Sequence, residues 1–234
     1  MTVEHSDPTF DERSDEDVLA ELAEEADLDD AGGEEEAPPA ADDEPTADAP
    51  AIGEAVLAVA LAEWNLGFAV VRANEDDQGR IRTYFAEGLG WSGRRWDAFA
   101  RKPSWCTAFA AYCLRTAHAR LGLEPPPQVH PRAGKNADVF AQAGRFLPAS
   151  AVFGRDRLPL ADAERMPGPG DLVIWQGHVG LLREIDADGN LLTIEGNTYI
   201  VQRGSQRWGV HPRRYSPRRD PKRWDTLKGF GLIG

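Results

Sequence analysis

Cysteine is scarce in this sequence of 234 residues, which contains only Cys106 and Cys113. On one predicted helix, two residues seven positions apart lie about 10.5 Å apart along the axis, whereas a disulfide needs Cα atoms within about 7 Å. We therefore expect Cys113 to be a core residue and Cys106 to stay free. No C-x-x-C pair is present, and Cys113 and His118 point to different faces of the helix, so the sequence predicts no metal site.

Long hydrophobic runs are also missing. The longest uninterrupted apolar run, 55–62, has 8 residues, against about 20 for a spanning helix, so it predicts a buried helix ending near Leu66. The first residues are acidic and lack the apolar segment of a secretory signal. The terminal G-x-G-x-x-G of residues 229–234 has no helix after it to bind a pyrophosphate, and it predicts no cofactor.

Positive charge is nearly absent from the first 50 residues, which hold 20 acidic residues and a single basic one, Arg13. Such a segment cannot support a packed core, so we expect residues 1–50 to form a disordered acidic tail and residues 51–234 to form one catalytic domain. A short amphipathic helix is possible around 15–26. The tail is interpreted as a solvated segment, a docking peptide for a protein partner, or a cover over a basic surface.

Cys106 is placed where a helix is predicted to begin. Ser104 is a favourable N-cap, apolar positions then recur at helical spacing as far as Ala117, and Gly122 and Pro125 end the helix. The backbone N–H groups and the positive dipole end of a first helical turn favour a thiolate over a thiol. This position therefore suits a nucleophile.

Among the five histidines, His178 is the best candidate for a base, because it opens a predicted strand directly after the strand 171–175. The turn 186–190 leads into a third strand, 191–195, so that an antiparallel meander brings His178 beside Glu195 or Asn197. Cys106, His178 and Glu195 thus have the residue types and chain order of nucleophile, base and orienter. Asn197 is an alternative orienter. Glu195 and Asn197 can also be read as ordinary turn residues.

Four motifs occur in order along the chain, and together they resemble the CHAP domain, a cysteine- and histidine-dependent amidohydrolase/peptidase of the NlpC/P60, papain-like superfamily. They are Trp105-Cys106-x-x-Phe109, Gly170-Asp171-Leu172-Val173, Gly177-His178-Val179-Gly180 and Ile194-Glu195-Gly196-Asn197. The resemblance covers about 52–234, with 227–233 matching the closing strand. It implies an α+β fold in which the cysteine helix packs on an antiparallel sheet.

The activity that the resemblance implies is cleavage of amide bonds in peptidoglycan, by an amidase or an endopeptidase. Cys106, His178, Glu195 and Asn197 are then the predicted catalytic residues, with the backbone N–H of Cys106 at the oxyanion. Trp105, in the first motif, and Trp175 are the predicted substrate-binding residues, and we expect Trp105 to pack beside the cleft rather than to take part in the chemistry. Without a Sec signal, such an enzyme would be made in the cytoplasm and reach a bacterial cell wall by lysis, as an endolysin does, or by another export route.

The segment 203–223 is rich in arginine and proline and is interleaved with aromatic residues. We rank an anionic cell-wall polymer first as its partner, an ordinary basic loop second and nucleic acid third, because the acidic tail would repel phosphates. Other functions stay open at this stage. They are hydrolysis of a small peptide conjugate or a protein, a wall-binding CHAP module without activity, and an interaction protein acting through the tail.

Overall fold

The computed structural model describes residues 49–67, 69–70, 75–91, 105–202 and 205–234. The predicted disordered tail and the helix expected around 15–26 lie outside these residues. The predicted start of the catalytic domain at residue 51 lies two residues after the start of the first described helix, α2 (Ala49–Asn65).

Seven antiparallel strands form a single sheet in the order β1-β6-β5-β4-β3-β7-β2. The strands are β1 (Ala69–Val70), β2 (Phe146–Pro148), β3 (Leu172–Trp175), β4 (Val179–Ile185), β5 (Leu191–Gln202), β6 (Ser205–Tyr215) and β7 (Leu227–Gly231). The predicted meander is confirmed as β3-β4-β5, and the predicted closing strand as β7. The α+β prediction is therefore correct.

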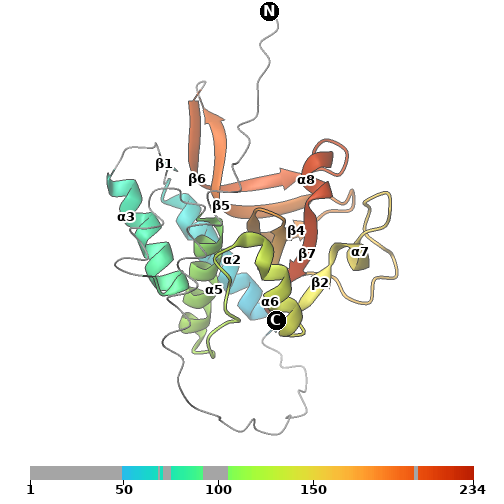
Figure 1. Ribbon diagram of the computed structural model, residues 1–234, viewed down its shortest axis with the longest axis horizontal. Helices are drawn as coiled ribbons and strands as arrows, with labels where there is room; N and C mark the ends of the chain where they lie inside the picture. The colour runs from blue at the N-terminus through green and yellow to red at the C-terminus, as the bar shows by residue number, and fades with distance from the viewer. Residues whose placement is uncertain (1–48, 68, 71–74, 92–104, 203–204) are drawn as a thin grey trace, which may run out of the picture.

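The helices lie mainly on one side of the sheet (Figure 1). Besides α2 they are α3 (Glu75–Thr83), the π-helix η1 (Tyr84–Gly88), α5 (Cys106–Leu121), the 3-10 turn η2 (Ala133–Lys135), α6 (Asn136–Gln142), α7 (Ala149–Val152) and α8 (Pro221–Asp225). No helix in the described part of the chain is long and apolar enough to cross a bilayer.

Helix α5 is the centre of the larger hydrophobic core. Its first nine residues, from Cys106 to Leu114, are all buried, and they share a cluster with Val56 of α2 and Ile194 of β5. Gly122 ends the helix in the left-handed conformation at φ 67°, which glycine adopts without a Cβ penalty. Two predictions are confirmed: the helix ends at Gly122, and Cys113 is a core residue.

A second core covers the opposite face of the sheet. Successive residues of β3 alternate between the two cores, with Leu172 and Ile174 facing α5 and Val173 and Trp175 facing the smaller cluster. Trp224 of α8 closes this smaller core against Phe153, with ring centroids 4.9 Å apart. All four residues of β3 are consequently buried.

A buried ion pair joins the amino-terminal helices to α5. Glu63 of α2 is 4% exposed and pairs with Arg80 of α3, and it also accepts a hydrogen bond of 2.8 Å from Tyr84. The Tyr84 ring stacks on Trp105 at 5.7 Å. Because Trp105 directly precedes α5, this network fixes the start of that helix.

Candidate active site

Cys106 is the first residue of α5. The N-cap position is Trp105, with φ −104° and ψ 14° and no side-chain cap, so the predicted cap at Ser104 is wrong by one residue, and Ser104 itself lies outside the described residues. Cys106 is fully buried. The helix nevertheless begins where its amino-terminal dipole end favours a negative sulfur.

His178 lies in the short connection between β3 and β4. Its carbonyl accepts a hydrogen bond of 2.9 Å from the backbone N–H of Trp175, which closes this turn. Its Nε2 donates to Oε2 of Glu195 at 2.9 Å. The side chain of His178 keeps 12% exposure whereas that of Glu195 keeps 1%, so the imidazole is the member of the pair that solvent reaches.

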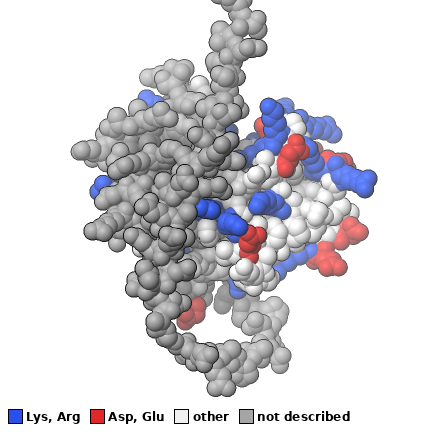
Figure 2. Space-filling view, in the orientation of Figure 1, with Lys and Arg blue, Asp and Glu red and all other residues white. Residues whose placement is uncertain are grey.

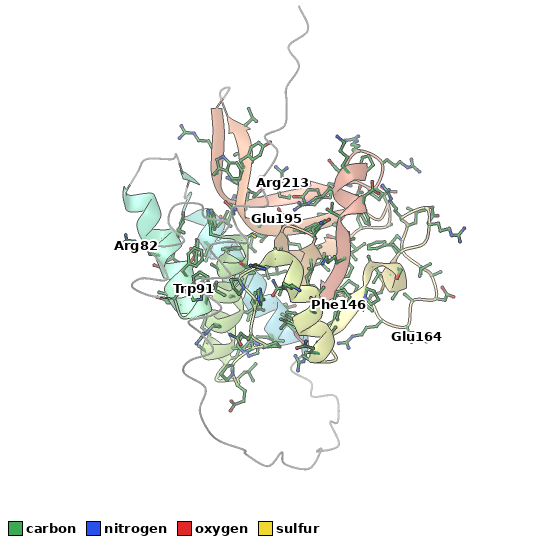
Figure 3. The ribbon with its side chains drawn as sticks, viewed as in Figure 1. Arg82, Trp91, Phe146, Glu164, Glu195 and Arg213 are labelled. Carbon is green, nitrogen blue, oxygen red and sulfur yellow. The ribbon has the colours of Figure 1, made fainter. Side chains whose placement is uncertain are left out.

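Glu195, which is labelled in Figure 3, is a buried carboxylate on β5. In addition to His178, it accepts hydrogen bonds from Oγ1 of Thr193 at 2.6 Å and from the hydroxyl of Tyr215 at 2.9 Å. Burial raises the pKa of Glu195, but the charge and hydrogen bond of His178 and the charge of Arg223 outweigh burial and lower it. The carboxylate is therefore ionised at neutral pH.

The imidazole of His178 interacts with both of its predicted partners. Burial lowers its pKa, but the negative charges of Cys106 and Glu195 and hydrogen bonds with both side chains raise it to about 9. Since Nε2 is bonded to Glu195, Nδ1 is the nitrogen that faces Cys106. A thiol, an imidazole and an orienting carboxylate are thus aligned, an arrangement that suits nucleophilic attack on a carbonyl.

Glycine allows two close approaches in this site. A Cβ on Gly180 would lie 2.8 Å from Cγ of Glu195, and a Cβ on Gly196 would lie 2.6 Å from Cβ of Phe109. The first glycine makes room for the carboxylate beside β4, and the second lets β5 lie directly on α5. The motif glycines therefore hold the carboxylate and the nucleophile helix together.

Asn197 does not continue β5 as an ordinary extended residue. The pairing of β5 with β6 shifts register between Glu195 and Thr198, and Asn197 has φ 55°, a left-handed conformation that asparagine tolerates better than most residues. Asn197 therefore does not share a strand face with Glu195 in the way that two residues of a regular strand would, because a bulge interrupts the alternation. Within the described residues, the hydrogen bond of the imidazole goes to Glu195 instead.

The two tryptophans predicted to bind substrate are packing residues. Trp105 is 2% exposed beneath Tyr84, and Trp175 is 1% exposed with its ring 5.9 Å from that of His178. Side chains this deeply buried present no surface to a substrate. The expectation that they bind substrate is therefore wrong. Trp105 is packed in the core next to Cys106, and Trp175 is packed in the core next to His178.

The basic segment 203–223 is not a simple loop. Its residues 205–215 form β6, which pairs with β5, and its residues 216–223 form a turn and the first part of α8. Tyr215 is buried in the second core, together with Trp224, which lies just beyond the segment. Arg218, Arg219 and Lys222 are exposed, whereas the guanidinium of Arg223 lies 4.2 Å above the Trp175 ring. Tyr215 and Trp224 are therefore not on the surface beside the exposed cations of this region.

Sequence reasoning missed Thr193 and Tyr215 as partners of Glu195. The contact of Thr193 could have been predicted, because residues two apart on a strand share a face. The contact of Tyr215 could not, because it depends on the pairing of β6 with β5, and no local sequence pattern predicts that pairing.

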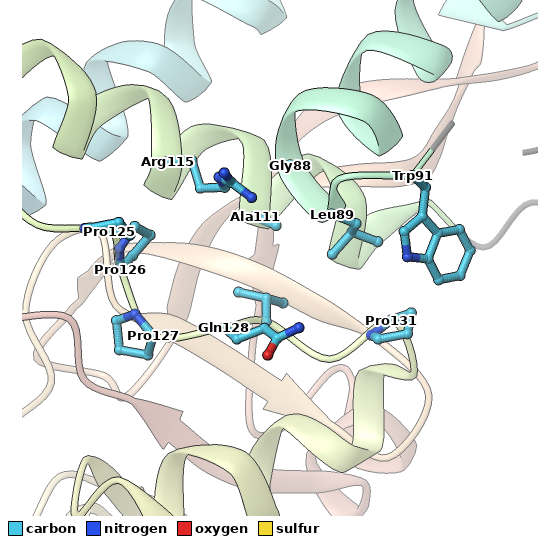
Figure 4. Close-up of a pocket in the computed structure, with 11 residues that line it drawn as sticks. Gly88, Leu89, Trp91, Ala111, Arg115, Pro125, Pro126, Pro127, Gln128 and Pro131 are labelled. Carbon is cyan, nitrogen blue, oxygen red and sulfur yellow. The ribbon is translucent and has the colours of Figure 1, made fainter. Parts of the chain in front are cut away.

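A cavity of about 240 Å³ lies further along α5, between Ala111 and Arg115 on one side and the proline segment 125–131 on the other (Figure 4). None of Cys106, His178, Glu195 and Asn197 lines it. Among the described residues, no group of three or more histidine, cysteine, aspartate or glutamate side chains could hold a metal ion.

Comparison with known families agrees with this geometry. Residues 96–197 match the family model of the CHAP domain. This region of the chain is therefore similar to a CHAP domain. The match includes Cys106, His178 and Glu195, and a CHAP domain implies a cysteine- and histidine-dependent amidohydrolase or peptidase. No curated protein and no solved structure matches the chain.

Proposed function

We propose that this protein is a cysteine-dependent hydrolase that cleaves an amide bond of peptidoglycan, as an N-acetylmuramoyl-L-alanine amidase or an endopeptidase. The observation that carries the proposal is the hydrogen bond of 2.9 Å between Nε2 of His178 and Oε2 of Glu195. It directs Nδ1 of the same ring towards Cys106. An amide hydrolase of this type needs a nucleophile, a proton carrier and a group that fixes the carrier's tautomer.

In the proposed reaction, the Cys106 thiolate attacks the amide carbonyl and a tetrahedral oxyanion forms near the amino-terminal end of α5, whose dipole favours negative charge. The imidazolium of His178 gives its proton to the leaving nitrogen, the C–N bond breaks and a thioester remains. Neutral His178 then takes a proton from water, and the resulting hydroxide attacks the thioester. The acid is released, and the proton held by His178 completes the thiolate–imidazolium pair again.

Glu195 is the proposed orienter, because it accepts the Nε2 proton and stabilises the imidazolium. Asn197 is the second candidate for that role, as the family motif implies, and its location two residues after Glu195, in the bulge of β5, supports this candidacy. The meeting of Cys106, His178 and Glu195 argues against a wall-binding module without activity.

Two features favour peptidoglycan over a small conjugate or a soluble protein. CHAP domains commonly act on peptidoglycan, and the described carboxyl-terminal region carries exposed cations, Arg218, Arg219 and Lys222, suited to anionic wall polymers. On the face that Figure 2 shows, lysine and arginine side chains gather towards the α8 side of the molecule, with some acidic side chains among them. We infer that the enzyme acts at the cell wall.

The test is incubation of the full chain with purified peptidoglycan, followed by mass spectrometry of the released fragments. We expect soluble fragments with a new amine and a new carboxylate at one type of bond, and none with His178→Ala. Release from a muropeptide between lactyl and alanine would identify an amidase, and release within the stem peptide an endopeptidase. Intact peptidoglycan together with hydrolysis of a soluble peptide would contradict the proposed substrate.

A further inference from the structure

Behind the His178–Glu195 pair lies a second set of side chains that comes from outside the family match of residues 96–197. Tyr215, at the end of β6, donates a hydrogen bond of 2.9 Å to Oε2 of Glu195, the same oxygen that faces His178. Tyr215 is 8% exposed. Two donors from different elements thus converge on one oxygen, which fixes the plane of the carboxylate.

Arg223, on α8, extends this set. Its guanidinium carbon lies 4.2 Å from the ring centre of Trp175 and 5.2 Å from that of Tyr215. Cations over aromatic faces are held by the ring quadrupole. Its Nε is buried without a hydrogen-bond partner among the described residues, so the aromatic rings, rather than a direct carboxylate contact, hold the charge in place.

We propose that Tyr215 and Arg223 are positioning residues of the active site: Tyr215 fixes the Glu195 carboxylate, and Arg223, held on Trp175 and Tyr215, maintains a positive charge behind it. The inference rests on the proposed function, because it assigns a role in that same site. It also gives this part of the basic segment a purpose other than wall binding.

The electrostatics of Glu195 agree with this assignment. The charge of Arg223 is among the causes that lower the pKa of Glu195, after burial, which raises it, and after His178. Other groups also face the carboxylate: Arg213 interacts electrostatically with it, and Tyr215 is kept neutral because burial raises its pKa. His211 is the cross-strand neighbour of Glu195. Burial lowers the pKa of His211, so this neighbour is neutral at pH 7.

Loss of either group should raise the pKa of Glu195 and lower kcat. Without the Tyr215 hydroxyl or the Arg223 charge, the ionised carboxylate is less stabilised, so the pKa of Glu195 rises and the acidic limb of the activity profile moves to higher pH. The imidazole is also held less firmly, so kcat falls. Because neither side chain is proposed to touch substrate, KM should change little.

The experiment compares Tyr215→Phe and Arg223→Met with two matched controls, Tyr199→Phe and Arg155→Met, in the full chain. Both control residues are exposed. The first readout is the pH dependence of kcat and KM on peptidoglycan. The second needs no substrate: the rate at which iodoacetamide alkylates Cys106 across the pH range, with the labelled peptide identified by mass spectrometry.

We expect each test variant to lose about tenfold in kcat and to shift the acidic limbs of activity and of alkylation upward by roughly one pH unit, the size of one lost hydrogen bond or nearby charge. Arg223→Lys should restore part of the shift, and the controls should match the wild type. The wild-type protein could fail to cleave peptidoglycan while the test variants still shift the acidic limb of Cys106 alkylation to higher pH. That result would support the positioning role and overturn only the proposed function. A raised KM with unmoved limbs, or equal effects in the controls, would overturn the inference.

Discussion

Glu195 illustrates how much the site depends on single residues. It is a fully buried carboxylate that accepts hydrogen bonds from His178, Thr193 and Tyr215. An ionised carboxylate is tolerated inside a protein only when it is paired and hydrogen-bonded in this way. The cost of burying the charge is therefore offset by the groups that give Glu195 its orientation.

Replacing Glu195 with glutamine tests which residue orients the imidazole. Glu195→Gln keeps the shape of the side chain but removes the charge that stabilises the imidazolium, so we expect turnover to fall by about 10²-fold or more with the fold retained. Asn197→Ala is the comparison, and we expect a smaller loss. Steady-state kinetics on peptidoglycan decides between them, and a greater loss in Asn197→Ala would exchange the two roles.

The pH dependence of activity gives a second prediction at this scale. The pKa of His178 is raised from 6.5 to about 9, so the imidazolium that protonates the leaving nitrogen is present below pH 9 and is lost as the pH rises through that value. We expect an alkaline limb of kcat/KM near 9, which belongs to the Cys106–His178 pair as a unit. In Glu195→Gln the loss of a negative charge should move that limb to lower pH. An unmoved limb would show that Glu195 does not act on the imidazole.

Among the secondary-structure elements, the approach of β5 to β4 and to α5 decides whether the site forms. Gly180 lies beside Glu195, and Gly196 lies against Phe109 and Trp105, with no room for a side chain at either position. The backbone of β5 at Gly196 therefore packs directly against a side chain of the nucleophile helix, Phe109. This packing is the link between the motif glycines and the catalytic geometry.

Gly180→Ala tests that link. A methyl group there meets Cγ and Oε1 of Glu195 at 2.8 and 3.3 Å, and overpacking of this kind typically costs about 1–3 kcal/mol of stability. We expect turnover to fall with it, because the carboxylate is displaced from His178. Gly177→Ala is the matched control, since nothing lies within 4 Å of its Cβ position. Urea unfolding and kinetics measure both effects, and identical behaviour of the two variants would contradict the assigned role of Gly180.

An element could be predicted from the sequence when the contacts that define it join residues close together in the chain. Helix α5, the β3-β4-β5 meander and the meeting of His178 with Glu195 depend on local periodicity and short turns, and all were predicted. The bulge at Asn197, the pairing of β6 and the contact of Tyr215 with Glu195 depend on packing between distant segments, which leaves no local pattern. Burial of Trp105 and Trp175 was missed for the same reason.

For the whole molecule, the separation of charge is the dominant feature. Residues 1–50 carry 20 acidic residues against a single basic one, whereas the remaining residues carry 25 basic and 19 acidic ones. In the described carboxyl-terminal region, Arg218, Arg219 and Lys222 are exposed. The acidic segment and the net positive remainder of the chain should attract each other at low ionic strength.

We therefore predict that the acidic segment competes with wall polymers for the basic surface. A truncated chain that begins at Ala49, where α2 begins, should bind insoluble wall material more tightly than the full chain at low salt. The difference should disappear at high salt, because charges are screened beyond about 8 Å at physiological ionic strength. Co-sedimentation across a salt series measures this. Equal binding at every salt concentration would contradict this prediction and would leave the acidic segment as a solvated appendage or as the ligand of another partner.

The central claim is that Cys106 is the nucleophile of a peptidoglycan hydrolase, and the two cysteines of the chain provide a direct test. Peptidoglycan turnover is measured for Cys106→Ala and for Cys113→Ala, with circular dichroism to verify the fold of each. Cys113 is buried and burial raises its pKa well above the ordinary value, so it is unsuited to attack a carbonyl. We expect Cys106→Ala to abolish turnover and Cys113→Ala to retain it. Wild-type turnover in folded Cys106→Ala would contradict the account.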